Sequence, residues 1–377
     1  MKNKRFSFRA IVITVLITFL LTGGLWILAA RCLLGPGRFA LLEGMFLIER
    51  RFVGEYDTDA MVDGALTGMV DALDDRWSVY MDPYWRALNE EAMKNAYVGI
   101  GISYLQSEDP FGMEIVSVAS GGPAEEGGIT VGEIITAVNG ETLTEDNLDA
   151  LVNPISAMEG QSITLTVQGT DGATREVTLQ VRQVKNSPVE YELLDNNVGY
   201  VRLVNFYQDA ASYTQAAVED LLAQGAEGLL FDVRNNPGGY VTELTKLLDY
   251  LLPEGPIFAE RSKAGTEKVV QSDAACVDVP MVVLVNGDSY SAAELFAAQL
   301  RESKGVKLVG EKTYGKGYYQ QGFVLSNGGE LHISTGMYTT GNGVSLIGTG
   351  LTPDYVVEGT EEQLEKGIDV LCKEYNP

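Results

Sequence analysis

The stretch "EGLLFDVRNNPGGYVTELTKLLDYLL", residues 227–252, decides the fold of the C-terminal half of this chain. Its first part, "EGLLFDVR", is a continuous apolar run, which is typical of a strand buried on both faces of a sheet. Its last part, "TELTKLLDYLL", has apolar residues at helical spacing, and the loop "RNNPGG" at 234–239 joins the two. A buried strand that leads through a loop into a helix is the repeating unit of an α/β layer structure.

The same unit recurs on both sides of this stretch. The strand "VGYVRLV" and the helix "DAASYTQAAVEDLLAQG" precede it, and the strand "PMVVLVNG" and the helix "AAELFAAQLRES" follow it. In sheets of this kind, chemistry gathers in the loops that leave the carboxyl ends of the strands. We therefore expect a functional site formed by "RNNPGG" (234–239), "NGDSYSAAE" (286–294) and "EKTYGKGYYQQG" (311–322).

The middle loop offers two serines, Ser289 and Ser291, directly before a helix. A serine in this position can expose its hydroxyl beside the N–H groups of the helix N-terminus, which favour a developing oxyanion. The same position is also that of an N-cap serine, one of the commonest ways to begin a helix. These residues alone leave both interpretations open.

A serine nucleophile needs a base, and the chain has one histidine, His332, in the strand-like run "GELHISTGMY". Lysine can replace histidine as the base when burial lowers its pKa. Lys316 stands between two glycines and close to three tyrosines, which provides close approach and a partly water-poor setting. Phosphate binding by "GKG" is the competing interpretation, but the full G-x-x-x-x-G-K-[ST] pattern is absent.

Residues 97–185 change to short β-type runs punctuated by glycine. The loop "YVGIG" (97–101) and the run "SGGPAEEGGITVGEIITAVNG" (120–140) resemble those of a PDZ domain. The resemblance implies that a ligand's terminal carboxylate binds backbone N–H groups while the ligand adds as an extra strand. The implied carboxylate-binding loop consists of Val98, Gly99, Ile100, Gly101 and Ile102.

The N-terminus carries a hydrophobic segment, 21 residues without a charge from Ala10 to Ala30, about the length of a membrane-spanning helix. Four cations precede it, which places the N-terminus in the cytoplasm and the body outside. A cleaved signal peptide is the alternative, but the run is long for one, and we favour an uncleaved anchor. Arg31 before Cys32 argues against a lipoprotein.

The body of the protein is acidic, because residues 32–377 hold 22 Lys and Arg against 52 Asp and Glu, a net charge of −30. This charge argues against nucleic acid as a ligand and suits an exported, soluble body. Three scattered cysteines with one histidine form no metal cluster, so we expect no metal and no cofactor. Their spacing leaves open whether Cys276 and Cys372 form a disulfide or stay reduced.

Taken together, the loops resemble those of the carboxyl-terminal processing peptidases, the tail-specific serine proteases of the S41 type. The family's nucleophile loop reads like G-S-A-S-A-S-E and its lysine loop like T-[FY]-G-K-G-x-x-Q, and this chain has "GDSYSAAE" and "TYGKGYYQ". The resemblance implies a catalytic Ser291, a general base Lys316 located 25 residues later, and a supporting Gln320. It also implies an oxyanion hole formed by Gly238, or Gly239, with the N–H of Ala292.

Two positions depart from the family pattern. Tyr290 replaces a small residue beside the nucleophile, and Ala293 replaces the family's last serine.

The resemblance implies an α/β protease core of the ClpP/crotonase-like layered kind, preceded by a PDZ domain, a helical segment and one transmembrane helix. The expected organisation is a cytoplasmic tail (1–9), a signal-anchor (10–30), a helical segment (36–92), a PDZ domain (97–185) and the protease core (186–377).

The expected function is that of a bacterial, membrane-anchored endopeptidase that acts outside the cell on proteins whose free C-termini the PDZ domain recognises. A noncatalytic PDZ adaptor is the alternative, and the family likeness implies a homodimer formed through residues 40–92.

Overall fold

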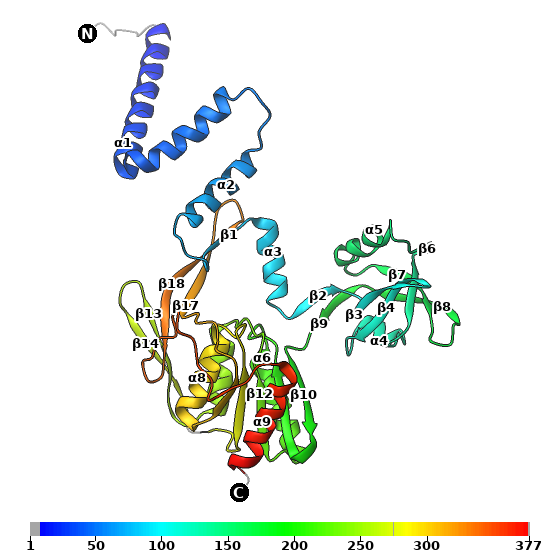
Figure 1. Cartoon of the computed structure of the whole chain (residues 1–377). Helices are drawn as coiled ribbons and strands as arrows, with labels where there is room; N and C mark the ends of the chain where they lie inside the picture. Colours follow the sequence, from blue (N-terminus) through cyan, green and yellow to red (C-terminus); the bar gives the residue numbers. More distant parts are fainter. Residues whose placement is uncertain (1–7, 274, 376–377) are drawn as a thin grey trace, which may run out of the picture. The chain divides into compact units, whose positions relative to one another are not determined.

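The computed structural model describes residues 8–273 and 275–375, and the chain divides into two compact units, one ending at Met69 and the other beginning at Val70 (Figure 1). The first unit is helical and contains α1 (Phe8–Arg51) and most of α2 (Thr58–Asp71). Helix α1 bends at Gly35, which has a φ of 73°, and Pro36 follows without an N–H to donate.

The apolar part of α1, Val12–Ala29, has a mean hydropathy of 2.3 and exposes its side chains. The predicted anchor at 10–30 is therefore helical, and its insertion into a membrane stays a prediction. Most of the predicted cytoplasmic tail at 1–9 lies outside the described residues.

The second unit begins with a lead-in that contains β1 (Val79–Met81) and α3 (Pro83–Ala92). Asp82 caps α3 by accepting a hydrogen bond of 2.8 Å from the Trp85 N–H. The sequence predicted only helices here. Strand β1 was missed because its three residues gain their regular structure by pairing with β18 (Glu330–Thr340), far along the chain.

The predicted PDZ segment forms a sheet in the order β3-β4-β5-β7-β8, with β6 beside β5, and a separate pair β2-β9. The predicted short β-type runs of residues 97–185 are strands. Ile163, Leu165 and Val167 of β7 are fully buried, because alternate residues of that strand face one core. The elements are β2 (Ala96–Gly99), β3 (Ile102–Glu108), β4 (Phe111–Val118), α4 (Pro123–Glu126), β5 (Ile134–Val138), β6 (Glu141–Thr142), α5 (Leu148–Val152), β7 (Ser162–Gln168), β8 (Thr174–Gln180) and β9 (Arg182–Lys185).

The C-terminal half is built on a six-stranded sheet in the order β10-β11-β12-β15-β16-β19, in which only β10 is antiparallel. Helices α6, α7 and α8 pack on one face and α9 on the other. Leu229 and Phe231 face the first core and Leu230 the second, which explains the continuous apolar run of β12. The elements are β10 (Val189–Leu194), β11 (Val198–Leu203), α6 (Ala210–Ala223), β12 (Gly228–Asp232), α7 (Val241–Leu251), β15 (Met281–Val285), α8 (Ala292–Lys304), β16 (Lys307–Gly310), β19 (Tyr355–Val356) and α9 (Thr360–Tyr375).

A second sheet has the order β1-β18-β13-β14, with β17 also paired to β18, and β17 begins at Tyr318, within the lysine loop. Its remaining strands are β13 (Gly255–Ser262), β14 (Glu267–Ser272) and β17 (Tyr318–Val324). His332 lies in β18, as its apolar neighbours predicted, and its Nδ1 is 3.3 Å from the carboxylate of Glu330.

The three loops of interest leave β12, β15 and β16, which are adjacent and parallel. Their carboxyl ends therefore meet at one edge of the sheet. The predicted meeting of the glycine, serine and lysine loops is present in the fold.

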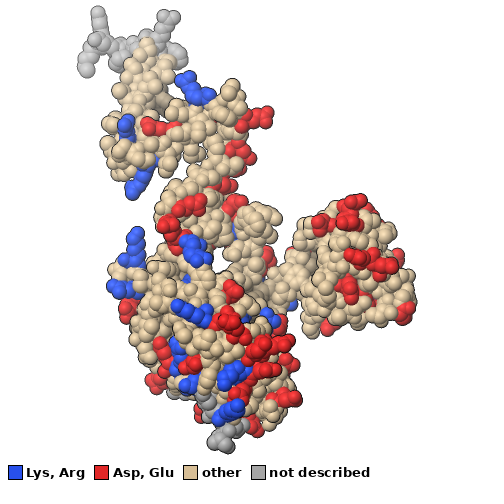
Figure 2. All heavy atoms as spheres, in the orientation of Figure 1, with Lys and Arg blue, Asp and Glu red and all other residues tan. Residues whose placement is uncertain are grey.

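All three cysteines are free, so the structure favours the reduced alternative for Cys276 and Cys372. Figure 2 shows acidic side chains spread widely over the face that it presents, with basic side chains between them.

Candidate active site

The two serines of the middle loop have different surroundings. Ser289 is fully buried and its Oγ donates to the Val233 carbonyl at 2.7 Å, so this hydroxyl holds the loop to β12. Ser291 lies at the N-cap of α8 with a φ of 61° and a ψ of −120°, and it lines a cleft of about 520 Å³. A strained backbone that exposes a serine at a helix N-terminus suits a nucleophile, and the N-cap interpretation holds at the same residue.

Glu294, in the first turn of α8, joins the serine loop to the lysine loop. It is fully buried, and its Oε1 accepts hydrogen bonds from the Thr313 hydroxyl (2.5 Å) and the Gly315 N–H (2.7 Å). Its Oε2 accepts from the N–H groups of Lys316 (2.8 Å) and Ser291 (3.1 Å). Burial raises the pKa of Glu294, and the four donors oppose that rise. Because all four groups donate, the carboxyl group acts as an ionised acceptor.

Glu294 was not among the candidate site residues that the sequence indicated. A single acid inside the apolar run "SAAELFAAQ" was the signal of a buried, bonded carboxylate.

Lys316 is half-buried in the same cleft as Ser291. Burial lowers the pKa of its amine to about 8, against the opposing charges of Asp75 and Glu294. Its Nζ lies 4.2 Å from the ring centroid of Trp77 and 5.9 Å from that of Tyr290. This setting matches the prediction of a lysine shielded from water, although the nearest ring comes from the lead-in rather than from a neighbouring tyrosine.

Gln320 also lines the cleft, with its amide nitrogen bonded elsewhere. Its Nε2 donates to the Ser334 hydroxyl (3.0 Å) and to the Tyr318 carbonyl (3.3 Å). Within residues 8–273 and 275–375, Gln320 makes no hydrogen bond with Lys316. The predicted tether is therefore not formed in this arrangement, and the Gln320 Oε1 is open to accept from an amine.

Tyr338 of β18 is a neighbour that the sequence did not reveal. Its side chain is buried, and its hydroxyl donates a hydrogen bond to the Lys316 carbonyl. Burial raises the pKa of the Tyr338 hydroxyl, and a hydrogen bond with Ser291 opposes that rise. Tyr338 thus touches both predicted members of the dyad.

The position of Tyr338, which contacts Ser291, also indicates how far His332 lies from Ser291. Tyr338 and His332 are six positions apart on β18, a span of about 20 Å along a strand. His332 lines the far part of the same cleft and is too distant to take a proton from Ser291.

The glycine loop presses directly against the serine loop. A Cβ on Gly238 would lie 2.9 Å from the Ala292 nitrogen and from the Ser291 Cβ, and a Cβ on Gly239 would lie 2.3 Å from the Phe206 carbonyl oxygen. Gly238 and Gly239 have φ values of 84° and 150°. Both close approaches require glycine.

The backbone N–H groups of Gly238, Gly239 and Ala292 differ in whether they already donate a hydrogen bond. The Gly238 N–H donates to the Asn236 Oδ1 at 2.8 Å. In the part of the chain that the structure describes, the N–H groups of Gly239 and Ala292 have no hydrogen-bond acceptor. Of the three predicted oxyanion donors, Gly239 and Ala292 are open, and Gly238 is engaged.

Comparison with known proteins shows the family of the chain. The profile of "Peptidase family S41" matches residues 197–357. The carboxy-terminal processing protease CtpA of Bacillus subtilis is 30% identical over 366 residues, which covers 95% of this chain and 78% of CtpA.

This chain belongs to the S41 carboxyl-terminal processing peptidases.

Other relatives of this S41 peptidase agree. A carboxyl-terminal-processing protease of Synechocystis is 32% identical over 76% of this chain and 70% of its own length. Among solved structures, the photosystem II D1 C-terminal processing protease has a TM-score of 0.51 at 26% identity and covers 91% of this chain and 93% of its own. The profile "PDZ domain" matches residues 114–169, and "Activating protease CtpB N-terminal domain" matches residues 41–84.

The PDZ domain of this S41 peptidase has a groove of about 270 Å³. Its lining includes Val152, Ile155, Tyr104 and Met113. The structure brings all five residues of the predicted carboxylate-binding loop to this groove: Val98, Gly99, Ile100, Gly101 and Ile102.

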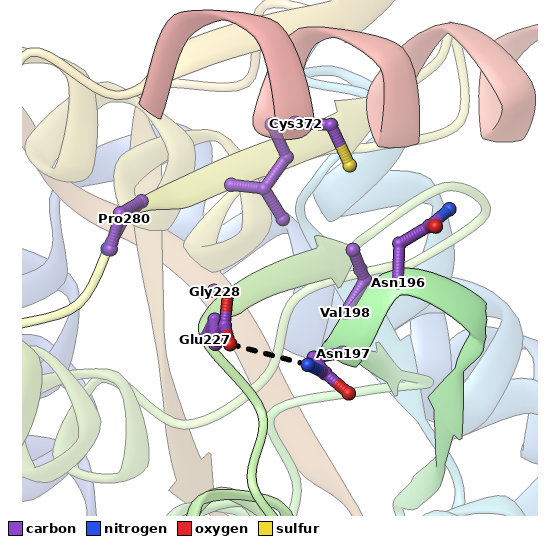
Figure 3. A pocket seen from close by; sticks show the side chains of 8 residues that line it. Asn196, Asn197, Val198, Glu227, Gly228, Pro280 and Cys372 are labelled. Atoms are coloured by element: carbon purple, nitrogen blue, oxygen red, sulfur yellow. Dashed lines mark hydrogen bonds between the residues drawn. The ribbon is translucent and has the colours of Figure 1, made fainter. Parts of the chain in front are cut away.

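A small pocket of about 30 Å³ lies elsewhere in the protease core (Figure 3). Val198 and Gly228, which begin β11 and β12, line it, and the Asn197 amide donates to Glu227 at 3.2 Å. It therefore sits at the amino ends of the strands, opposite the edge where the three loops meet.

Proposed function

We propose that this S41 peptidase is a membrane-anchored, extracytoplasmic serine endopeptidase that uses Ser291 as nucleophile and Lys316 as general base. The observation that carries the proposal is the cleft that Ser291 and Lys316 share, in which burial lowers the pKa of the lysine to about 8. A serine at a strained helix N-terminus and a lysine that is partly neutral near physiological pH supply the two groups that acyl transfer requires.

The reaction begins when the neutral amine of Lys316 takes the proton of the Ser291 hydroxyl while Oγ attacks a peptide carbonyl carbon. The protonated lysine then gives that proton to the leaving amine, which leaves an acyl group on Ser291. Water, activated by the same amine, hydrolyses the acyl-enzyme. In this scheme the Gln320 Oε1 accepts from the amine and holds it, while Ser334 fixes the other end of the amide.

The oxyanion of the tetrahedral intermediate needs backbone donors. We assign the open N–H groups of Gly239 and Ala292 to it, and Gly238 joins them if its N–H turns from Asn236. Removal of one such donor costs about 3 kcal/mol in comparable sites, so the glycine loop contributes on the same scale as the dyad.

In this proposal the PDZ groove captures the free C-terminus of a substrate, and the apolar part of α1 anchors the enzyme in the membrane with its N-terminus in the cytoplasm. Dimerisation through residues 40–92 is proposed by family likeness.

The test uses the full-length protein in detergent with an unstructured protein that ends in an apolar residue. We expect cleavage by the wild type and none by the Ser291→Ala and Lys316→Ala variants. C-terminal amidation of the substrate should weaken its capture. Binding of the free C-terminus without cleavage by the wild type would support the noncatalytic adaptor instead.

A further inference from the structure

A loop of the lead-in, residues 75–78 between α2 and β1, forms one wall around Lys316. The Trp77 ring lies 4.2 Å from the Lys316 Nζ, and it contacts the rings of Tyr314 and Tyr290 at centroid distances of 5.4 Å and 6.0 Å. The rings of Trp77 and Tyr290, from the lead-in and the serine loop, both lie within 6 Å of the Lys316 amine, and the Tyr314 ring packs against both of them. The sequence around Lys316 indicated only its neighbouring tyrosines as a shield.

Pairing and hydrogen bonds hold this loop in place. Strand β1 pairs with β18, and the Ser78 Oγ accepts a hydrogen bond of 3.0 Å from the Ser334 N–H. Asp75 accepts from the Ser78 hydroxyl at 2.6 Å. Burial raises the pKa of Asp75, but hydrogen bonds from Ser78 and Ser334 outweigh burial and lower it. Asp75 therefore stays ionised near the amine, and Ser334 connects it to Gln320.

Trp77 lines a different hollow from the one that Lys316 lines. It lines an open hollow of about 640 Å³ together with Asp71, Asp74, Asp75, Arg76, Ser78 and Tyr318, but it does not line the catalytic cleft. Lys316 lines the cleft and not this second hollow. Removal of the indole would therefore expose the amine to water from the side of the lead-in.

We infer that Trp77 is a positioning residue for the peptidase reaction, which holds the Lys316 amine in the cleft and keeps water from it, and that Asp75 beside it supplies an opposing charge. This inference rests on the proposed Ser291–Lys316 dyad. It assigns to the lead-in, which precedes the PDZ domain, a direct part in the chemistry of the protease core.

Trp77 and Asp75 should shift the pKa of Lys316 in opposite directions. Burial lowers the pKa of Lys316, whereas the charge of Asp75 raises it. The indole face also attracts an ammonium ion, but at partly exposed sites this is worth less than about one pKa unit, so shielding dominates. The other charged and titratable groups around Trp77 and Lys316 stay unchanged in the test, namely Arg76 on the lead-in, Glu294 on α8, Tyr290, Tyr314 and Tyr338.

The experiment compares full-length wild type with Trp77→Ala, Trp77→Phe and Asp75→Asn. The Trp85→Ala and Asp74→Asn variants are the matched controls, because both residues are exposed parts of the lead-in outside the catalytic cleft. For each protein, kcat/KM for a peptide is measured from pH 6 to pH 10, and thermal unfolding confirms folding. In parallel, the pH dependence of acetylation of the Lys316 amine is followed by mass spectrometry in the Ser291→Ala background.

We expect Trp77→Ala to raise the midpoints of both profiles by about one pH unit, which lowers kcat/KM about tenfold at pH 7 and restores it at pH 10. Phenylalanine should return both midpoints to near the wild-type value. Asp75→Asn should lower both midpoints, and the two controls should leave them unchanged.

Three outcomes would overturn the inference. If Trp77→Ala lowers kcat/KM equally at every pH with unmoved midpoints, Trp77 is only structural. If Trp77→Ala raises kcat/KM at pH 7, the Trp77 ring lowers the activity of the Lys316 amine instead of positioning it for the reaction. If the acetylation midpoints shift as expected but the kinetic midpoints do not, Lys316 is not the base, and the proposed dyad fails together with the inference.

Discussion

Replacement of Glu294 by glutamine should separate the alignment of the serine and lysine loops from substrate binding. In the wild type, each carboxylate oxygen accepts two hydrogen bonds, one oxygen from Thr313 and Gly315 and the other from Lys316 and Ser291. Glutamine keeps one oxygen and turns an NH₂ group toward two donors. Two charge-assisted bonds are lost, each worth about 1.5–3 kcal/mol, so the substitution costs about 3 kcal/mol or more.

This cost falls on the relative position of the serine and lysine loops. A displacement of about 1 Å in a catalytic group lowers the rate about 100-fold, and we expect that decrease in kcat. Because Glu294 does not line the cleft, KM should stay within about twofold. Since the Glu294 charge raises the pKa of Lys316, the remaining activity should also have a midpoint at lower pH.

The assay is peptide cleavage by the full-length protein from pH 6 to pH 10, with Glu365→Gln on α9 as the control because Glu365 is exposed. Wild-type kcat in a folded Glu294→Gln variant would refute the reasoning. A rise in KM at unchanged kcat would show that Glu294 serves substrate binding and not alignment.

Three further predictions concern the cleft of Ser291 and Lys316, the glycine loop and the PDZ groove. Lys316→Ala should abolish cleavage while His332→Ala keeps wild-type kcat/KM, since His332 is about 20 Å from Tyr338 along β18; the opposite result would make histidine the base. Gly238→Ala should lower kcat at least about 100-fold because its Cβ would lie 2.9 Å from the Ala292 nitrogen and the Ser291 Cβ. Gly265→Ala is the control, because Gly265 has a comparable positive φ but open space around it, and this variant should keep the wild-type kcat. Equal losses of kcat in the two variants would mean that backbone strain alone matters. Val152→Glu should raise KM about tenfold for a protein with a free C-terminus and leave the KM of an amidated peptide unchanged. Val131→Glu is the control, because Val131 is exposed. An unchanged KM for the protein with a free C-terminus would exclude the groove from substrate capture.

Strands β11, β12 and β15 were predictable because their signals are local. A continuous apolar run marked β12, and glycines marked the turns that follow β12 and β15. Since parallel strands end at one edge, the meeting of Gly238, Ser291 and Lys316 followed from their order in the chain.

The surroundings of the site were not predictable, because they depend on long-range pairing. Trp77 reaches Lys316 through the pairing of a three-residue strand with β18, and Tyr338 comes from the far end of the same β18. The bonding of Gln320 to Ser334 likewise depends on the register of β17 against β18, which places those two residues opposite each other. The sequence of the lysine loop alone does not determine how β17 pairs with β18.

The central claim is that Ser291 is a nucleophile activated by Lys316, and the most direct measurement is the rate at which a fluorophosphonate modifies the intact, full-length protein. We predict one adduct, on Ser291, with a rate that rises as the pH passes about 8 and the Lys316 amine loses its proton. Lys316→Ala should slow the modification at every pH. An adduct on another residue, or an equal rate in the Lys316→Ala variant, would contradict the claim.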